Sequence, residues 1–168
     1  MDAYLAIVSR REVRRYDGRP LPDDTVRRIL DAGRLSGSSK NRQARRFVVV
    51  RSRVQEVAAA VWNPANVEGA ALVVAIVVAG KGPLAFDAGR AGQNMLLAAW
   101  SEGIGSCPNG VSDGEAMGRA LDLAEGEQVA IVLSFGYPLR PVSPERRPVE
   151  RWVEAADRVP FEDAVQVL

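Results

Sequence analysis

Ala71-Leu72-Val73-Val74-Ala75-Ile76-Val77-Val78 is the stretch that decides the fold. It is apolar throughout and rich in valine, so it predicts a strand at the centre of a sheet. A turn at Lys81-Gly82-Pro83 follows, and then comes the longest helical pattern of the chain, from about Leu84 to Glu102. A chain of 168 residues suits one domain with one core, which is expected over residues 1–168.

Two further strands are expected around this pair. The unbroken apolar run at 47–50 predicts a strand that is buried on both faces, and the run at 129–135 predicts another. Residues 103–110 are punctuated by glycine and contain Pro108, so we expect a loop there.

Helices are indicated by apolar residues at helical spacing and by capping residues at their starts. Asp23 or Asp24 suits the N-cap of one helix, and Ser112 to Glu115 matches a capping box that opens another. In the long helix, residues 95–100 are apolar on every side, which means that they are enclosed in a large core or between two chains. The small size of the chain favours a dimer interface. The shorter helices are expected at 2–9, 23–35, 54–61, 112–121 and 149–155.

The composition excludes several kinds of active site. The chain has no histidine, which removes histidine-based triads and nearly every common zinc or iron site. Cys107 is the only cysteine, so there is no internal disulfide and a reducing, cytoplasmic setting is expected. The N-terminus shows no signal pattern, and the longest apolar run, 69–80, is too short to span a bilayer. An enzyme of this composition is expected to rely on a bound organic cofactor.

Positive charge gathers at the front of the chain. The net charge is only +1, yet residues 1–53 carry 14 Lys and Arg against 6 Asp and Glu. The densest part is Arg10-Arg11-Glu12-Val13-Arg14-Arg15-Tyr16. Three interpretations stay open on the residues alone: a solvated loop paired with nearby carboxylates, a nucleic-acid surface, or a site for a phosphate-bearing cofactor closed by Arg146 or Arg147. Nucleic acid is disfavoured, because no groove-reading element is evident and only 6% of residues are aromatic.

The familiar nucleotide-binding fingerprints are absent. In the loop that begins at Gly103, Pro108 stands where the third glycine of a dinucleotide-binding turn would be. Neither Lys40 nor Lys81 has the complete set of glycines and the following hydroxyl residue of a P-loop.

Five segments, in order along nearly the whole chain, resemble those of the FMN-dependent nitroreductase family. They read IVSRREVRRY at 7–16, GSSKNRQARRF at 37–47, DAGRAGQNMLLAA at 87–99, GIGS at 103–106 and GYP at 136–138. The resemblance implies a compact α+β fold over the whole chain, a three-layer sandwich in which helices flank a central mixed β-sheet. It also implies an intertwined homodimer that holds two FMN molecules at the subunit interface.

The resemblance implies cofactor contacts in three parts of the chain. Arg10 and Arg14 would contact the phosphate, ribityl chain or pyrimidine side of the flavin, and Arg146 or Arg147 would meet its phosphate. The 37–47 segment would line the site and reach the flavin of the partner. The backbone N–H of Asn109 or Gly110 would lie near flavin N5, with no catalytic side chain and no metal. The implied contact residues are Arg10, Arg11, Arg14, Ser38, Ser39, Asn41, Gln43, Pro108, Asn109, Gly110, Arg146 and Arg147.

The function implied is hydride transfer from NADH or NADPH, through FMN, to an electron-poor acceptor such as a nitroaromatic or a quinone. The alternatives are a flavin-binding protein with little turnover, used for storage, sensing or regulation, and a related flavin dehydrogenase or oxygenase. A deazaflavin in place of FMN also stays open. The expected partners are a second copy of the chain and a small-molecule acceptor, without nucleic acid or membrane. The chain departs from the family pattern at Glu12, Gly37, Ala44 and Arg45, and in a short 51–70 segment.

Overall fold

The computed structural model describes residues 1–168, which form two compact units. The larger unit comprises residues 11–142, and the smaller unit joins residues 1–10 to residues 143–168. A single domain over the whole chain stays a prediction.

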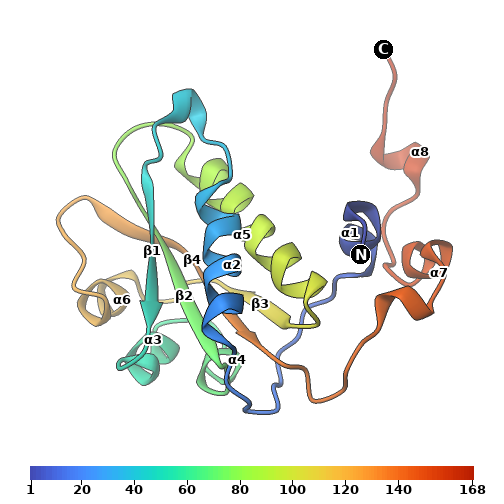
Figure 1. Ribbon diagram of the computed structural model, residues 1–168. Helices are drawn as coiled ribbons and strands as arrows, with labels where there is room; N and C mark the ends of the chain where they lie inside the picture. The colour runs from blue at the N-terminus through green and yellow to red at the C-terminus, as the bar shows by residue number, and fades with distance from the viewer. The chain divides into compact units, whose positions relative to one another are not determined.

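A four-stranded sheet forms the centre of the larger unit (Figure 1). Its strand order is β1-β2-β4-β3, with β1 at Arg45–Val50, β2 at Leu72–Ala79, β3 at Gly105–Asn109 and β4 at Glu127–Gly136. Residues 72–78 of β2 are all buried, and β2 pairs with strands on both sides. The prediction of a central strand at this stretch is therefore confirmed.

The sheet was expected to be mixed, but its four strands pair antiparallel throughout. The one parallel contact is an isolated bridge between Glu12 and Ser106, on the outer side of β3. The mixed character is therefore limited to the place where the N-terminal segment of the larger unit meets the edge of the sheet.

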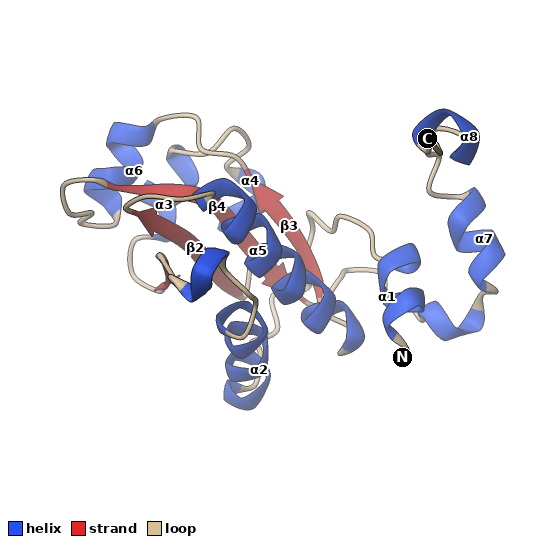
Figure 2. Ribbon diagram, turned by 90° about the horizontal axis from the view of Figure 1, so that it is seen from above, coloured by secondary structure: helices blue, strands red, loops and turns tan.

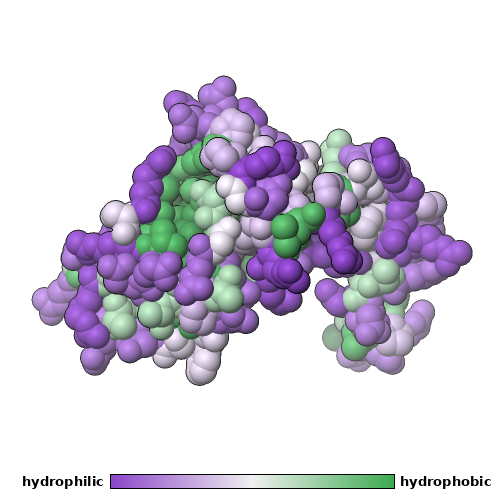
Figure 3. All heavy atoms as spheres, turned by 90° about the horizontal axis from the view of Figure 1, so that it is seen from below, coloured by the Kyte–Doolittle hydropathy of each residue, from purple (hydrophilic) through white to green (hydrophobic).

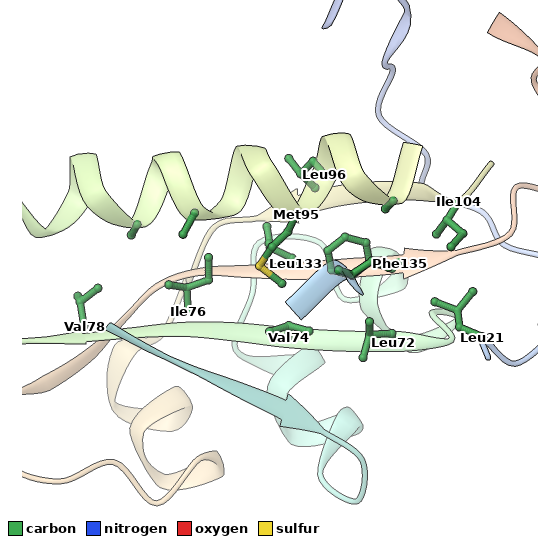
Figure 4. Packing of buried hydrophobic residues seen from close by; sticks show 14 residues of the cluster. Leu21, Leu72, Val74, Ile76, Val78, Met95, Leu96, Ile104, Leu133 and Phe135 are labelled. Carbon is green, nitrogen blue, oxygen red and sulfur yellow. The ribbon is translucent and has the colours of Figure 1, made fainter. Parts of the chain in front are cut away.

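Helices cover both faces of the sheet, which confirms the three layers. One face carries α2 (Asp23–Arg34) and α5 (Leu84–Ser101), and the other carries α3 (Val54–Ala59), α4 (Ala65–Glu68) and α6 (Gly114–Ala120). Successive side chains of a strand point to opposite faces, so Val74 and Ile76 pack toward α5 while Val73 and Ala75 pack toward α3 and α6. Figure 4 shows the α5 side of this core, with Met95 lying over the strands.

Two helix starts differ from the prediction. The N-cap of α2 is Pro22, and Asp23 and Asp24 lie in the first turn without a capping bond, where their charge still favours the helix dipole. The N-cap of α6 is Asp113, whose carboxylate accepts the N–H of Ala116 at 2.9 Å. The expected capping box from Ser112 is therefore wrong by one residue.

Two strand predictions also need correction. The strand at 47–50 was expected to be buried on both faces, but β1 is an edge strand and only Val50 is buried. The expected loop at 103–110 contains the edge strand β3, which pairs with β4. Tertiary pairing overrides the poor strand propensity of glycine and proline here, because Pro108 stands on an edge strand, where proline is tolerated.

The smaller unit consists of helices and loops (Figure 2). It contains α1 (Ala3–Ser9), the 3₁₀ turn η2 (Pro144–Arg146), α7 (Val149–Glu154) and α8 (Phe161–Ala164), and α1 packs against η2 and α7. Trp152 is buried and donates its indole N–H to the carbonyl of Pro144 at 3.1 Å. Leu5 is buried, whereas Ile7 and the tail residue Phe161 are exposed. Across both units, no helix combines the length and the apolar character needed to cross a membrane.

Candidate functional site

Residues 11–16, at the start of the larger unit, form a basic segment that lies along the edge of the sheet. The N–H of Val13 donates to the carbonyl of Ser106 at 3.0 Å, and the N–H of Leu139 donates to the carbonyl of Arg15 at 3.3 Å. Asp17 donates its N–H to Tyr137 at 2.9 Å. These backbone bonds hold the segment in one place, so its arginines are presented by a fixed backbone and not by a free surface loop.

Two glycines make this close approach possible. Gly105 of β3 and Gly136 of β4 are paired across the sheet. A Cβ on Gly105 would stand 2.5 Å from the Cβ of Val13, and a Cβ on Gly136 would stand 2.8 Å from the ring of Tyr16. Any larger residue would push the segment away from the sheet. Gly105 and Gly136 thus have one shared structural purpose.

A pocket of about 460 Å³ lies beside the segment, within the larger unit. Arg14, Arg15 and Arg140 bring three positive charges to its wall, and Glu12 brings one negative charge. The rest of the wall is apolar and is formed by Val13, Pro138, Leu139 and Val142. A pocket that combines apolar surface with an excess of guanidinium groups suits an anionic ligand that has an apolar body.

A buried polar network stands behind this segment. The hydroxyl of Tyr16 donates to the carbonyl of Val13 at 2.8 Å and contacts Ser134 at 3.1 Å. The side-chain N–H₂ of Asn109 donates to the carbonyls of Cys107 and Val132 and to the hydroxyl of Ser134, at 3.0, 3.3 and 3.2 Å. Burial raises the pKa of Tyr16 well above its usual value, so this phenol stays protonated.

Two polar atoms next to this network are buried and have no partner within the chain. They are the side-chain carbonyl oxygen of Asn109 and the hydroxyl oxygen of Ser106. Buried polar groups normally find hydrogen-bond partners, so atoms of this kind indicate a place where a ligand or water completes the site. Asn109 was expected to offer its backbone here. The structure shows in addition that its side chain is 4% exposed and fixed in place.

Cys107 is buried beside the network and is a packing residue. The amide of Asn66 on α4 contacts its sulfur at 3.8 Å. Desolvation by burial raises the pKa of the Cys107 thiol, and the negative charge of Glu12 raises it further. The thiol therefore stays protonated. Sequence reasoning missed Asn66 and Ser134, although the hydroxyl of Ser134 inside an apolar strand was a detectable signal.

A second group of predicted site residues forms the turn before β1. The 3₁₀ turn η1 (Ser39–Asn41) lies in it, and Lys40, Asn41 and Gln43 all have φ near +52°. Non-glycine residues in this conformation carry strain, and the surrounding contacts must hold them. The hydroxyl of Ser38 accepts the N–H of Gln43 at 2.9 Å, and the carboxylate of Asp87 on α5 accepts the N–H of Ser39 at 3.0 Å.

The expected residues thus fall into separate groups. Arg14 lines the pocket beside the basic segment, which we call the arginine pocket. This pocket is not lined by Ser38, Ser39, Asn41 or Gln43. Pro108 and Gly110 are exposed on either side of the buried Asn109, at the end of β3. Arg11 is half-buried at the start of the larger unit.

The remaining expected arginines belong to the smaller unit. Arg10 is the C-cap of α1, and its N–H donates to the carbonyl of Ala6. Arg146 ends η2, and the guanidinium of Arg147 lies 4.4 Å from the centre of the Trp152 ring. Both side chains are exposed.

Comparison with known proteins identifies the group of proteins to which the chain is related. The pattern of the Nitroreductase family matches residues 7–81 and 82–137. The chain belongs to the nitroreductase family. A relative from Methanothermobacter thermautotrophicus, provisionally named NADH dehydrogenase/NAD(P)H nitroreductase, is 30% identical over 90% of this chain and 88% of its own length.

Solved structures of the family agree with the fold. A provisionally assigned nitroreductase from Desulfovibrio desulfuricans, crystallised in complex with FMN, is 30% identical and has a TM-score of 0.74, over 96% of this chain and 99% of its own. A nitroreductase family protein from Clostridium difficile has a TM-score of 0.82 at 21% identity, over 99% of this chain and 98% of its own.

Proposed function

We propose that this chain is an FMN-dependent oxidoreductase of the nitroreductase type, which passes electrons from NADH or NADPH to an electron-poor acceptor such as a nitroaromatic or a quinone. The observation that carries the proposal is the arginine pocket at the edge of the sheet, with Arg14, Arg15 and Arg140 around an apolar floor. Its support from relatives is the 30% identical family member that was crystallised with FMN.

The residues present fit FMN. The cofactor combines a flat, largely apolar ring system with a phosphate, and the pocket combines apolar residues with three guanidinium groups. Its volume of about 460 Å³ lies within the usual range for small-molecule sites. The unpartnered oxygens of Asn109 and Ser106 supply acceptors at the neighbouring strand end. Glu12 is the one unfavourable charge, and the guanidinium groups around it outnumber it.

When bound, FMN would supply the ring that takes a hydride from the nicotinamide and gives electrons to the acceptor. The chain's own residues would bind and orient it. Arg14 and Arg11 would place positive charge beside the phosphate or pyrimidine, and guanidinium groups there would stabilise negative charge on the reduced ring. Tyr16 would stay neutral because burial holds its proton.

The other expected residues keep their proposed roles by family resemblance. Pro108, Asn109 and Gly110 would present backbone beside the ring. Ser38, Ser39 and Asn41 would line the site, and Asn41 and Gln43 would reach the cofactor of a partner chain. The roles proposed for Arg10, Arg146 and Arg147 at the phosphate rest on the resemblance alone.

We further propose that the protein works as a homodimer. A groove of about 560 Å³ runs between α5 and β4, and it is lined mainly by apolar residues such as Leu84, Ala88 and Ile131. Phe86 on the same helix is 65% exposed. Figure 3 shows apolar residues gathered on the surface of the larger unit. A second copy of the chain that covers the groove between α5 and β4 would remove its apolar lining from water.

The visible spectrum of the purified protein tests the cofactor and the donor together. We expect a yellow protein, or a colourless one that turns yellow with added FMN, and we expect NADH or NADPH to bleach it without oxygen. A protein that binds no FMN contradicts the proposal. A protein that stays yellow with both nicotinamides, yet bleaches with dithionite, is a flavin-binding protein without this activity.

A further inference from the structure

Positive charge without carboxylate partners gathers at one end of the larger unit, away from the arginine pocket. Lys40 and Arg42 lie in the turn before β1, Lys81 lies in the loop after β2, and Arg90 lies on α5. All four side chains are exposed, and none of them forms an ion pair. We call these four residues the cation cluster.

Several contacts show that the cluster is continuous in space. The guanidinium of Arg90 lies 2.5 Å from the position that a Cβ on Gly37 would take. The guanidinium of Arg42 lies 3.0 Å from the position of a Cβ on Gly82, which is next to Lys81. The turn before β1 and the loop after β2 lie at the same end of the unit in Figure 1. Residues that are distant in the sequence thus bring their charges to one surface.

The cluster has little negative charge beneath it. Asp87 is the carboxylate in contact with this turn, and it is buried and accepts the N–H of Ser39. Arg45 lies behind the turn and donates to the carbonyl and hydroxyl of Ser36, while its Nε and Nη1 atoms are buried without partners. The uncompensated charge of Arg45 adds to that of the cluster.

The backbone keeps the cluster in position. Lys40, at the centre of the turn, has φ of 52°, and the neighbouring Asn41 shares this strained conformation. The bond from Ser39 to Asp87 ties the turn to the first turns of α5. A strained turn that is held by a buried carboxylate is a rigid support for exposed charges, so the backbone that carries Lys40 and Arg42 does not have to be organised on binding.

We propose that the cation cluster binds the phosphate groups of the nicotinamide dinucleotide donor, and that it makes NADPH the preferred donor over NADH. The inference rests on the proposed function, and it adds the class of donor and the residues that select it. NADPH carries an additional phosphate at the adenosine ribose, and charge-assisted bonds from lysine and arginine to phosphate are among the strongest that exposed residues make. A surface with four unpaired cations favours the more highly charged donor.

The test uses the FMN-loaded protein with Lys40→Asn and Arg42→Gln combined. Asparagine tolerates positive φ, so the turn keeps its shape while the charge is lost. We expect kcat/KM for NADPH to fall about tenfold, and kcat/KM for NADH to change much less, because the lost contacts are those to the additional phosphate. Lys81→Gln with Arg90→Gln gives an independent second variant on the other side of the cluster.

A binding measurement accompanies the kinetics. Calorimetry with adenosine 2′,5′-bisphosphate and with adenosine 5′-monophosphate isolates the contribution of the additional phosphate. The wild-type protein is expected to bind the bisphosphate more tightly, and the double variant is expected to lose that difference. Arg119→Gln removes one exposed charge on α6, on the opposite face of the sheet, and controls for a general effect of net charge.

Three results would overturn the inference. They are equal use of NADH and NADPH by the wild-type protein, a preference for NADPH that survives in both variants, and loss of FMN affinity in the variants with the donor preference unchanged. The last result would assign the cluster to the phosphate of the flavin. If the chain binds no FMN, the proposed function fails, but the calorimetry still decides whether the cluster recognises the additional phosphate.

Discussion

Arg14 shows how a single residue acquires meaning from its surroundings. In the sequence it is one of four arginines in seven residues, and a solvated loop explains it as well as a ligand does. In the structure its backbone is held along the sheet, and its side chain lines a pocket with Arg15 and Arg140. A fixed guanidinium group at a pocket is the arrangement that anion binding requires.

Arg14→Ala is expected to weaken FMN binding about tenfold or more, because a charge-assisted contact to the cofactor is lost. The unfolding midpoint in urea should change little, since the side chain is exposed. Fluorescence titration with FMN measures the first effect. Arg27→Ala, an exposed arginine of α2 outside this pocket, serves as the control. Equal FMN affinity in the two variants would contradict a role of Arg14 in FMN binding and leave the basic segment with a structural role only.

Asn109 contributes both to the stability of the fold and to the candidate site. Asn109→Ala removes three donated hydrogen bonds in a buried place. We expect the free energy of unfolding to fall by about 2–3 kcal/mol, because acceptors are left unpaired. Urea unfolding followed by circular dichroism measures this change. A loss below about 0.5 kcal/mol, the usual size for surface substitutions, would show that the network contributes little.

At the scale of elements, helix and strand ends were harder to predict than helix and strand centres. The start of α6 is an example, since the sequence favours a cap from Ser112 and the structure uses Asp113. The two residues are adjacent and have similar capping propensities, so only the backbone geometry decides between them.

This difference predicts opposite results for two neighbouring substitutions. Asp113→Ala should cost about 1 kcal/mol of stability, because the N–H of Ala116 loses its acceptor. Ser112→Ala should fall within about 0.5 kcal/mol of the wild type, because its side chain is exposed and makes no cap. Parallel urea unfolding curves compare them. The reverse order would restore the capping box expected from the sequence.

The sheet is also tied together at its end by an ion pair that spans a strand. Arg46 of β1 reaches past β2 to Glu127 of β4, with a contact of 2.7 Å. The bond from Arg46, with help from the N–H of Ala124, lowers the pKa of Glu127 from 4.5 to about 2. A carboxyl group with a lowered pKa in the folded state stabilises above its unfolded pKa, and this contribution is lost as the pH falls toward 2.

Glu127→Gln should therefore lower the urea midpoint at neutral pH, and the difference from the wild type should shrink as the pH falls from about 5 to about 2. Unfolding curves across this range provide the measurement. Glu115→Gln is the control, because that side chain is 93% exposed and its ion pair with Arg119 is a long contact of 3.8 Å. A difference between wild type and Glu127→Gln that is independent of pH would assign the effect to packing.

At the scale of the whole molecule, the apolar groove beside α5 is the feature that one chain leaves incomplete. We expect a molar mass twice the 18.1 kDa of one chain, measured by light scattering after size-exclusion chromatography. Ala85→Glu, at an exposed position on the wall of the groove, places a charge there and is expected to shift the protein toward the monomer. A wild-type protein that is a monomer at micromolar concentration would contradict the proposed dimer.

The sequence was most informative where burial is decided by local pattern. The run 71–78 identified the central strand, and helical spacing identified α2 and α5, because an apolar face must be buried whatever covers it. The family resemblance supplied the three layers. The edge position of β1 and the existence of β3 were not predictable, because they depend on which strands meet across the sheet.

The same distinction between local pattern and tertiary arrangement applies to the candidate site. The residue types and their order along the chain, through the family resemblance, predicted that arginines and the polar 37–47 segment would be the binding elements. Only the tertiary structure decided that Arg14 and Arg140 share a pocket, that Gly105 and Gly136 let the basic segment approach the sheet, and that the guanidinium of Arg90 lies against Gly37 at another surface. The physical reason is that local pattern encodes what a residue prefers, whereas a binding site is an arrangement of residues far apart in sequence, which only folding brings together.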